Sequence, residues 1–147
     1  MRRVILVGFM GSGKTTLGKK VANRLNVPFI DSDQEIEKNY QMSIGDIFGS
    51  FGESRFREIE TDFIRSYDDE GEFVMAVGGG TPCFNKNMEH LNKLGVTFYL
   101  ERSAKELSYR LENAKTRRPM LSGLSEGELL LFIEDKLAVR DDFYKMP

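Results

Sequence analysis

The feature that most constrains this chain is a glycine-rich loop that directly follows a short apolar run near the N-terminus. Residues 4–7 read V-I-L-V, which is typical of a strand buried on both faces of a sheet. Residues 8–15 read G-F-M-G-S-G-K-T and match G-x-x-x-x-G-K-[ST] in full. Leu17, Val21 and Leu25 then recur at helical spacing, which predicts a helix over residues 14–25. Strand, glycine loop and helix in this order predict a phosphate-binding P-loop.

Each part of the loop has a chemical reason. Glycines let successive backbone N–H groups turn toward one anion without a clash from a Cβ atom. The following helix directs the positive end of its dipole at the phosphates. The Lys14 ammonium can reach the β- and γ-phosphates of a nucleoside triphosphate, and the Thr15 hydroxyl can ligate Mg²⁺. The residues expected to bind nucleotide phosphates are Gly11, Ser12, Gly13, Lys14, Thr15 and Thr16.

Predicted strands and helices alternate along the rest of the chain. Strands are expected over residues 27–30, 73–77 and 96–100. Helices are expected over residues 34–39, 44–50, 54–67, 88–94, from Ser103 onward, and from a capping box at 125–128 to about Tyr144. Residues 1–147 therefore predict one α/β domain, a three-layer P-loop fold with a central parallel sheet and helices on both faces.

Composition narrows the classes of partner. A formal net charge of -2 lacks the basic excess of a nucleic-acid-binding protein. The single cysteine, Cys83, excludes a disulfide framework and fits a reducing compartment, so a cytoplasmic location is expected. The apolar run at residues 4–7 is too short for a membrane span. We therefore expect partners other than nucleic acid or membrane.

Three classes of P-loop protein compete for this sequence. A signalling GTPase needs the motif N-K-x-D after a strand, and the pairs Asn85-Lys86 and Asn92-Lys93 both lack the aspartate. A motor or transport ATPase needs a longer chain and an apolar strand that ends in an acidic pair, and no such pattern occurs in this sequence. A small-molecule kinase is compatible with the short chain.

Further motifs, in their order and approximate spacing, resemble those of the shikimate kinase family. Besides G-F-M-G-S-G-K-T-T, they are D-S-D at 31–33, I-F at 47–48 with G-E at 52–53, F-R-E-I-E at 56–60, G-G-G at 78–80, R-P-M-L at 118–121, and Arg140 with Tyr144. They cover nearly the whole chain and are specific in combination. The resemblance implies ATP-dependent phosphorylation of the 3-hydroxyl of shikimate, with Mg²⁺, by a monomer. Two alternatives stay open: a kinase for gluconate or a related hydroxy acid, and an inactive nucleotide-binding module.

Two aspartates follow the second predicted strand, where open α/β sheets bind ligands. Asp31 and Asp33 stand at i and i+2, so on an extended segment their side chains would point the same way. One carboxylate can hold Mg²⁺, and the other can accept a proton or a hydrogen bond from a substrate hydroxyl. The resemblance gives Asp31 the metal role and Asp33 the substrate role. Without the P-loop, helix capping or turn formation would be the better explanation.

Two arginines are expected to bind a substrate carboxylate. Arg57 and Glu60 have ion-pair spacing on a predicted helix, which on its own would fit a surface pair equally well. The resemblance implies that Arg57 binds the carboxylate of shikimate and that Glu60 holds it in place. A guanidinium suits a carboxylate through two parallel hydrogen bonds. Arg140 is the second candidate, although Asp142 stands where many family members have proline.

Three consecutive glycines, Gly78, Gly79 and Gly80, follow the third predicted strand. They allow the backbone to approach a ligand closely, and we expect backbone N–H contacts near the reacting hydroxyl. A flexible turn is the alternative.

The resemblance also assigns the remaining segments. Residues 31–62 are expected to bind the substrate, and the basic stretch at 113–124 is expected to form a mobile lid over phosphates. Arg118 matches the family's catalytic arginine on the transferring phosphoryl group, with Arg117 as the neighbouring alternative, and Arg110 is expected to pack on adenine. Family members usually continue for a further strand and helix, which this sequence is expected to lack.

Overall fold

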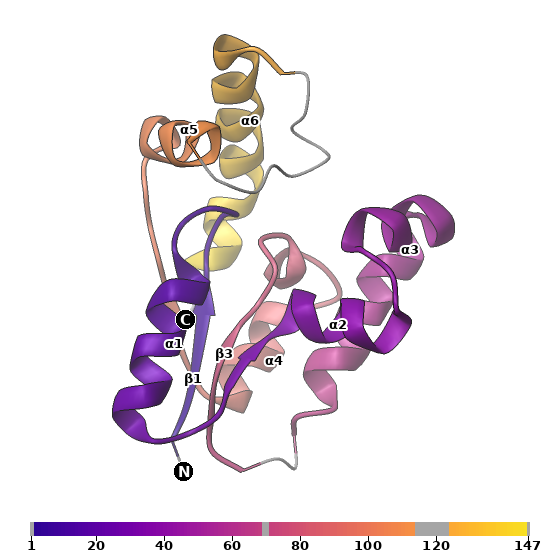
Figure 1. Ribbon diagram of the computed structural model, residues 1–147, viewed down its shortest axis with the longest axis vertical. Coiled ribbons are helices and arrows are strands. Elements are labelled where there is room, and N and C mark those ends of the chain that lie inside the picture. The colour runs from indigo at the N-terminus through magenta and orange to yellow at the C-terminus, as the bar shows by residue number, and fades with distance from the viewer. Residues whose placement is uncertain (1, 69–70, 114–123, 147) are drawn as a thin grey trace.

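A four-stranded parallel sheet forms the centre of the molecule in the computed structural model (Figure 1). The structure describes residues 2–68, 71–113 and 124–146. The strands are β1 (Arg3–Val7), β2 (Phe29–Asp31), β3 (Phe73–Ala76) and β4 (Val96–Tyr99). Their order is β2-β3-β1-β4, with Val4 of β1 opposite Val74 on one side and Val96 on the other. The four predicted strands and their parallel arrangement are confirmed.

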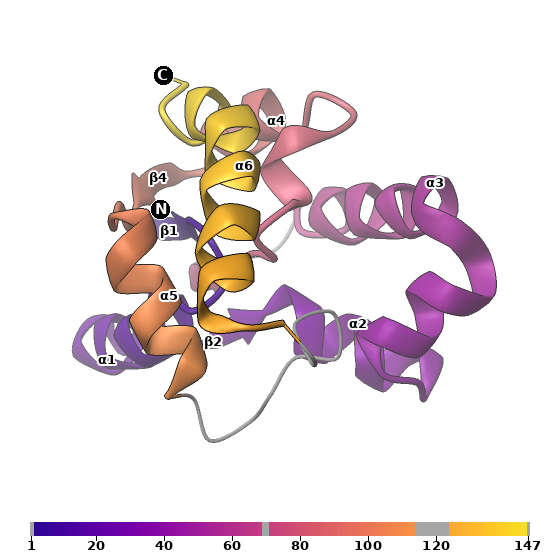
Figure 2. The same ribbon diagram turned by 90° about the horizontal axis from the view of Figure 1, so that it is seen from above.

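Helices cover both faces of this sheet, so the predicted three-layer arrangement is also confirmed. Helix α1 (Lys14–Leu25) packs on the face that presents Leu6 and Val74. The opposite face presents Ile5, Val7 and Met75 to helices α3 (Ile44–Arg65), α4 (Asn87–Leu94) and α6 (Glu126–Tyr144) (Figure 2). Apolar side chains on both faces explain why β1 and β3 read as continuous apolar runs.

The remaining elements differ from the predicted ones most clearly at the start of α2. They are α2 (Ser32–Tyr40), α3 (Ile44–Arg65), the short 3₁₀ helix η1 (Thr81–Cys83), α4 (Asn87–Leu94), α5 (Ala104–Glu112) and α6 (Glu126–Tyr144). Helix α2 begins at Ser32, two residues earlier than predicted, because Asp31 caps it. The predicted break between the helices over residues 44–50 and 54–67 is confirmed, because α3 consists of two helical segments on either side of a kink at Gly52.

The kink at Gly52 shapes the arm that α2 and α3 form beside the sheet (Figure 2). Gly52 has φ 82° and ψ 166°, a conformation that side-chain-bearing residues rarely adopt. The chain therefore changes direction at this residue, which separates the two helical segments of α3.

Small residues form the face of α1 that packs on the sheet. Leu17, one of the apolar residues at helical spacing, is 41% exposed. Gly18 and Ala22 are the buried residues of this helix. An ideal Cβ built on Gly18 would overlap the ring of Phe29 in β2. The absence of that Cβ lets α1 lie close to the strand that ends at Asp31.

Strand β4 borders the described part of the sheet. Val96 and Phe98 lie on the same face of the sheet as Val4 and Leu6, and they are 60% and 51% exposed. The expected lid falls mostly on residues 114–123, which lie outside the described residues. Within the described ranges, no helix combines the length and apolar character that a membrane crossing requires.

The close packing of α1 on β2 predicts a loss of stability in Gly18→Ala. The added methyl group has to displace Phe29, so the free energy of unfolding should fall by about 1–3 kcal/mol. Gly127→Ala is the matched control, because Gly127 is also helical and has nothing within 4 Å of its ideal Cβ. The control should be neutral or slightly stabilising. Urea denaturation of both variants measures this, and equal midpoints would contradict the packing argument.

Candidate active site

The P-loop connects β1 to α1 in the conformation that its glycines permit. Gly11 has φ 80°, and Gly13, the N-cap of α1, has φ 100°. Both values lie where a Cβ is unfavourable, so glycine is needed for backbone reasons. The Lys14 ammonium donates hydrogen bonds to the carbonyl oxygens of Gly8, at 2.6 Å, and of Phe9, at 3.0 Å. Lys14 therefore spans the start of the loop, and exposed Thr16 lies in the first turn of α1.

Two arginines hold the P-loop from the side of α5. Nε of Arg110 donates to the carbonyl oxygen of Gly11 at 2.6 Å, and Nε of Arg102 donates to that of Ser12 at 2.8 Å. Arg110 thus lies beside the P-loop, and its contact with adenine stays a prediction. The sequence analysis missed Arg102. Its position just after β4, which neighbours β1, is the signal that could have revealed it, since parallel neighbours end at the same edge.

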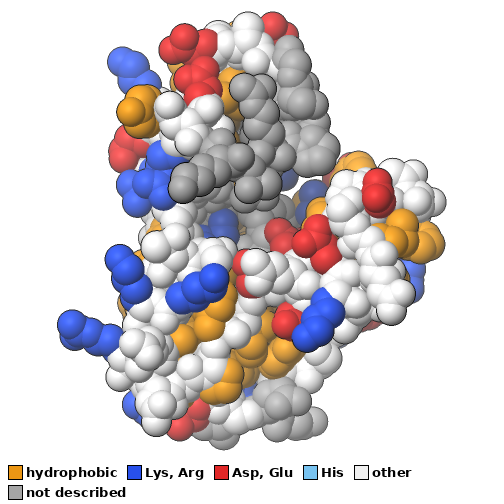
Figure 3. All heavy atoms as spheres, viewed as in Figure 1, with side chains coloured by type: hydrophobic (Ala, Val, Ile, Leu, Met, Phe, Trp, Pro, Cys, Tyr) orange, Lys and Arg blue, Asp and Glu red, His pale blue; other side chains and the backbone are white. Residues whose placement is uncertain are grey.

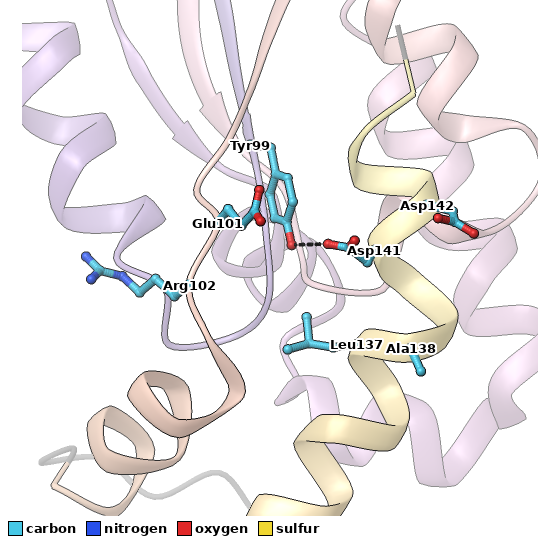
Figure 4. A pocket seen from close by; sticks show the side chains of 7 residues that line it. All are labelled: Tyr99, Glu101, Arg102, Leu137, Ala138, Asp141 and Asp142. Atoms are coloured by element: carbon cyan, nitrogen blue, oxygen red, sulfur yellow. Dashed lines mark hydrogen bonds between the residues drawn. The ribbon is translucent and has the colours of Figure 1, made fainter.

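A hollow of about 320 Å³ lies beside the P-loop, between the end of β4 and α6 (Figure 4). Within it the Tyr99 hydroxyl donates to Oδ1 of Asp141 at 2.8 Å. Hydrogen bonds from Lys145 and then from Tyr99 lower the pKa of Asp141. Arg102 points away from this hollow, toward the P-loop and α1 (Figure 4).

Asp31 connects the P-loop to α2. Its Oδ2 accepts a hydrogen bond from the Thr15 hydroxyl at 3.0 Å, and its Oδ1 accepts one from the backbone of Gln34 at 3.2 Å. The Asp31 carboxylate therefore both caps α2 and contacts the P-loop. Asp33 lies inside the first turn of α2, so the predicted extended geometry of the aspartate pair is wrong. The early start of α2 causes this difference.

Asp33 and Arg57 both lie against the glycine loop, residues 78–80. An ideal Cβ at Gly78 would be 2.8 Å from Oδ1 of Asp33. An ideal Cβ at Gly80 would be 2.6 Å from Nη1 of Arg57. A side chain at either position would therefore have to displace the end of Asp33 or of Arg57. The contact of this loop with a substrate stays a prediction.

The middle residue of this loop contacts the P-loop and α6. An ideal Cβ at Gly79 would be 3.2 Å from the backbone nitrogen of Met10 and 3.6 Å from Nη1 of Arg140. The Tyr144 hydroxyl donates to the carbonyl oxygen of Gly79. Arg140 therefore reaches the same loop as Asp33 and Arg57, even with Asp142 in the usual place of proline.

The Arg57–Glu60 pair is buried. Nη1 of Arg57 donates to Oε1 of Glu60 at 2.7 Å, and the Arg57 side chain is 12% exposed. Burial raises the pKa of Glu60, while Arg57 and then the Thr81 hydroxyl act in the opposite direction. The surface-pair alternative is thereby wrong. The guanidinium lies 4.3 Å from the ring centroid of Phe84 and 5.3 Å from that of Phe56.

Charged side chains of both signs gather around the notch between the α2–α3 arm and the α5–α6 end of the molecule (Figure 3). The predicted residues Arg117 and Arg118 lie outside the described residues. The described ones place a lysine, two aspartates and three arginines around two adjoining loops. A P-loop with these neighbours defines a phosphotransferase of the P-loop kinase class.

The comparisons with known proteins identify the family. The shikimate kinase family model matches residues 10–146. The shikimate kinase of Bacteroides fragilis is 43% identical over 145 residues, which cover 99% of this chain and 81% of that protein. That of Parabacteroides distasonis is 45% identical over 144 residues, with 98% and 83% covered. This chain belongs to the shikimate kinase family and is a kinase.

Solved structures agree with this assignment. The shikimate kinase of Bacteroides thetaiotaomicron superposes with a TM-score of 0.95 at 43% identity, covering 97% of this chain and 81% of that one. The Acinetobacter baumannii enzyme in complex with shikimate gives 0.86 at 34% identity, covering 99% and 79%. A gluconokinase from Sinorhizobium meliloti gives 0.57 at 15% identity, covering 99% and 98%, a likeness of fold alone.

The environment of Cys83 predicts an unreactive thiol. Burial raises the pKa of Cys83 to about 11, from an ordinary value of 9.0. Because only the thiolate is nucleophilic, its fraction at pH 8 should be about a hundredfold below that of an ordinary thiol. Alkylation by iodoacetamide should be correspondingly slow, and should accelerate as the pH rises toward 11.

Cys83 is the only cysteine in the chain, so incorporated label reports on this thiol alone. The same chain in concentrated urea is the control and should react at the ordinary rate. Equal rates in the folded and unfolded protein would contradict the burial of this thiol.

Proposed function

We propose that this chain transfers the γ-phosphoryl group of ATP to the 3-hydroxyl of shikimate, giving shikimate 3-phosphate. The observation that carries the proposal is the convergence of Asp33, Arg57 and Arg140 on the glycine loop, whose Gly79 adjoins the P-loop. The P-loop, which would bind the phosphates of ATP, thus lies beside two arginines and an aspartate that suit a hydroxylated carboxylic acid. The relative from Acinetobacter baumannii that is described in complex with shikimate supports this substrate.

The carboxylate of shikimate is proposed to bind between Arg57 and Arg140. Among the described residues, Nε of Arg57 is buried without a hydrogen-bond acceptor, and Oε1 of Glu53 lies 3.8 Å away. A buried donor without an acceptor is unfavourable, and a ligand carboxylate would satisfy it. Backbone N–H groups of Gly78, Gly79 and Gly80 are proposed to contact the substrate near the reacting hydroxyl.

At the other end of the site, Asp33 orients the attacking hydroxyl and accepts its proton late in the reaction. The transition state of phosphoryl transfer is loose, so positioning and electrostatics supply most of the catalysis. Lys14 exchanges its bonds to loop carbonyls for bonds to the phosphates. Arg118 is proposed to neutralise charge on the transferring group, Arg110 to contact adenine, and the lid to exclude water.

ATP-dependent kinases generally need a divalent cation, and we propose Mg²⁺. The Thr15 hydroxyl and the Asp31 carboxylate are hard oxygen donors 3.0 Å apart at the mouth of the P-loop. Mg²⁺ prefers such donors, so the pair fits a site in which the Thr15 hydroxyl would ligate the ion directly. The ion would neutralise charge on the β- and γ-phosphates. Asp31 is proposed to hold it through water.

The described residues contain no group of three or more His, Cys, Asp or Glu side chains suited to a metal. The proposed ion would draw its other ligands from the phosphates of ATP and from water. A cytoplasmic location and a monomeric state stay predictions, supported by the single half-buried thiol for the location.

Substitutions at the two ends of the site should separate turnover from substrate binding. Lys14→Ala should lower kcat by about a hundredfold or more, since Lys14 acts on the phosphoryl group. Arg57→Ala should mainly raise the KM for shikimate, by about ten- to a hundredfold. A coupled assay of ADP release measures both constants.

Arg55→Ala is the matched control for Arg57→Ala. Arg55 lies on the same helix and forms an exposed pair with Glu58. Its removal should change neither constant more than about twofold. An equal loss of kcat and substrate affinity in all three variants would argue against the assigned roles.

A substrate panel tests the proposed specificity. ADP release should be fastest with shikimate and near background with gluconate and with nucleoside monophosphates, since two arginines and Asp33 match a hydroxylated carboxylic acid. Faster turnover of gluconate would replace the proposed substrate. Nucleotide binding without turnover of any of these compounds would favour the inactive module.

A further inference from the structure

We propose that the hydroxyl of Thr81 positions the shikimate-binding guanidinium of Arg57, acting through the carboxylate of Glu60. The inference rests on the proposed function, because it assigns the substrate carboxylate to Arg57. Thr81 would be a positioning residue, since its hydroxyl contacts Glu60 rather than the substrate.

Thr81 is held at all of its polar groups. It is the first residue of η1 and is 0% exposed. Its backbone N–H donates to the carbonyl oxygen of Gly78 at 3.1 Å. Its carbonyl oxygen accepts from the side chain of Asn87 at 2.9 Å, and its hydroxyl donates to Oε2 of Glu60. The hydroxyl therefore has a fixed position at the end of the glycine loop.

The two oxygens of Glu60 have different partners. Oε1 accepts from Arg57 at 2.7 Å, and Oε2 accepts from Thr81. Glu60 is 2% exposed, so water has little access to replace a lost donor. Removal of the Thr81 hydroxyl would leave Oε2 without this donor. The carboxylate could then rotate or shift, and the Arg57 guanidinium would move with it.

The contacts with the glycine loop show why such a shift would matter. Arg57 lies against Gly80, and the Thr81 hydroxyl would be 3.1 Å from an ideal Cβ at Gly78. Asp33 lies against that same residue, Gly78. The chain from Thr81 through Glu60 to Arg57 therefore fixes the distance between the carboxylate-binding end and the hydroxyl-binding end of the site.

The ionisation of Glu60 offers a second observable. Burial raises the pKa of Glu60, and Arg57, the Thr81 bond and Arg140 oppose that rise. Cys83, Tyr144 and Glu53 are further titratable groups that face this cluster. Without the Thr81 bond the pKa of Glu60 should rise further, and a protonated Glu60 no longer forms an ion pair with Arg57. As the pH is lowered, shikimate binding should therefore begin to weaken at a higher pH in a variant without this bond than in the wild type.

The test compares Thr81→Val, which keeps the shape and removes the hydroxyl, with Thr81→Ser, which keeps the hydroxyl. Thr81→Val should raise the KM for shikimate about five- to twentyfold, the size expected for one buried hydrogen bond to a charged group. The KM for ATP should stay within about twofold, and Thr81→Ser should restore the KM for shikimate to within about threefold of the wild type. The acid limb of kcat/KM for shikimate should move to higher pH in Thr81→Val.

Thr61→Val is the matched control. Thr61 is a buried threonine on α3 whose hydroxyl donates to the backbone carbonyl of Arg57 at 2.9 Å rather than to Glu60. It should cost stability without moving the acid limb. A wild-type KM in Thr81→Val, a serine variant as impaired as the valine one, or the same acid-limb shift in Thr61→Val would overturn the inference.

Two further outcomes distinguish a positioning role of Thr81 from a loss of folding and from a failure of the proposed function. Thr81→Ala removes the hydroxyl without adding an apolar branch. If both Thr81→Val and Thr81→Ala are unfolded at the assay temperature by circular dichroism, the hydroxyl serves the fold and the inference is wrong. Failure of the proposed function itself would appear in the wild type, as absence of shikimate turnover.

Discussion

The parallel pairing of β3 between β2 and β1 is the constraint on which the site depends. Parallel neighbours end at the same edge of a sheet, so the three segments that follow these strands must meet there. They are the P-loop, residues 31–33 and the glycine loop. No one of them could form the site alone, because the phosphate-binding groups, the carboxylates and the close backbone approach come from different strands.

The site also depends on charged groups that are buried. Arg57 and Glu60 are withdrawn from water, and their free energy of desolvation is offset by mutual attraction and by neighbouring donors and aromatic rings. Such an arrangement is weak evidence for stability, but it holds a guanidinium in one orientation before a ligand arrives. Preorganised charge is what phosphoryl transfer requires of a protein, since the reacting groups need positioning more than covalent chemistry.

The sequence predicted the strands, their parallel arrangement and the P-loop, because apolar runs and glycine patterns are local signals. The F-G-E stretch at residues 51–53 predicted an interruption between two helices, and the non-helical conformation of Gly52 confirms it. The prediction was wrong where a local signal had two meanings: D-S-D at 31–33 fits an extended segment, but Asp31 caps α2 and Asp33 lies inside that helix.

Family resemblance supplied the residues of the candidate site, but not the contacts among them. That Thr81 meets Glu60, or that Tyr144 meets Gly79, depends on which loops lie together after folding. Arg102 was missed for the same reason: a charged residue after a strand has no distinctive pattern until the neighbouring strand is known. Arg117 and Arg118 lie outside the described residues, and their roles stay predictions.

A position can require glycine because a side chain would clash, or because its backbone conformation is unfavourable for an L-residue. At Gly52 only the second reason applies. An ideal Cβ there would have nothing within 4 Å, so only the chirality of the backbone, with φ at 82°, disfavours a side chain. A D-amino acid prefers that half of the Ramachandran map. D-alanine introduced by chemical ligation would therefore fit at this position and reduce the conformational entropy of the unfolded chain, whereas L-alanine would be strained. The bend of the α2–α3 arm is thus set by handedness rather than by packing.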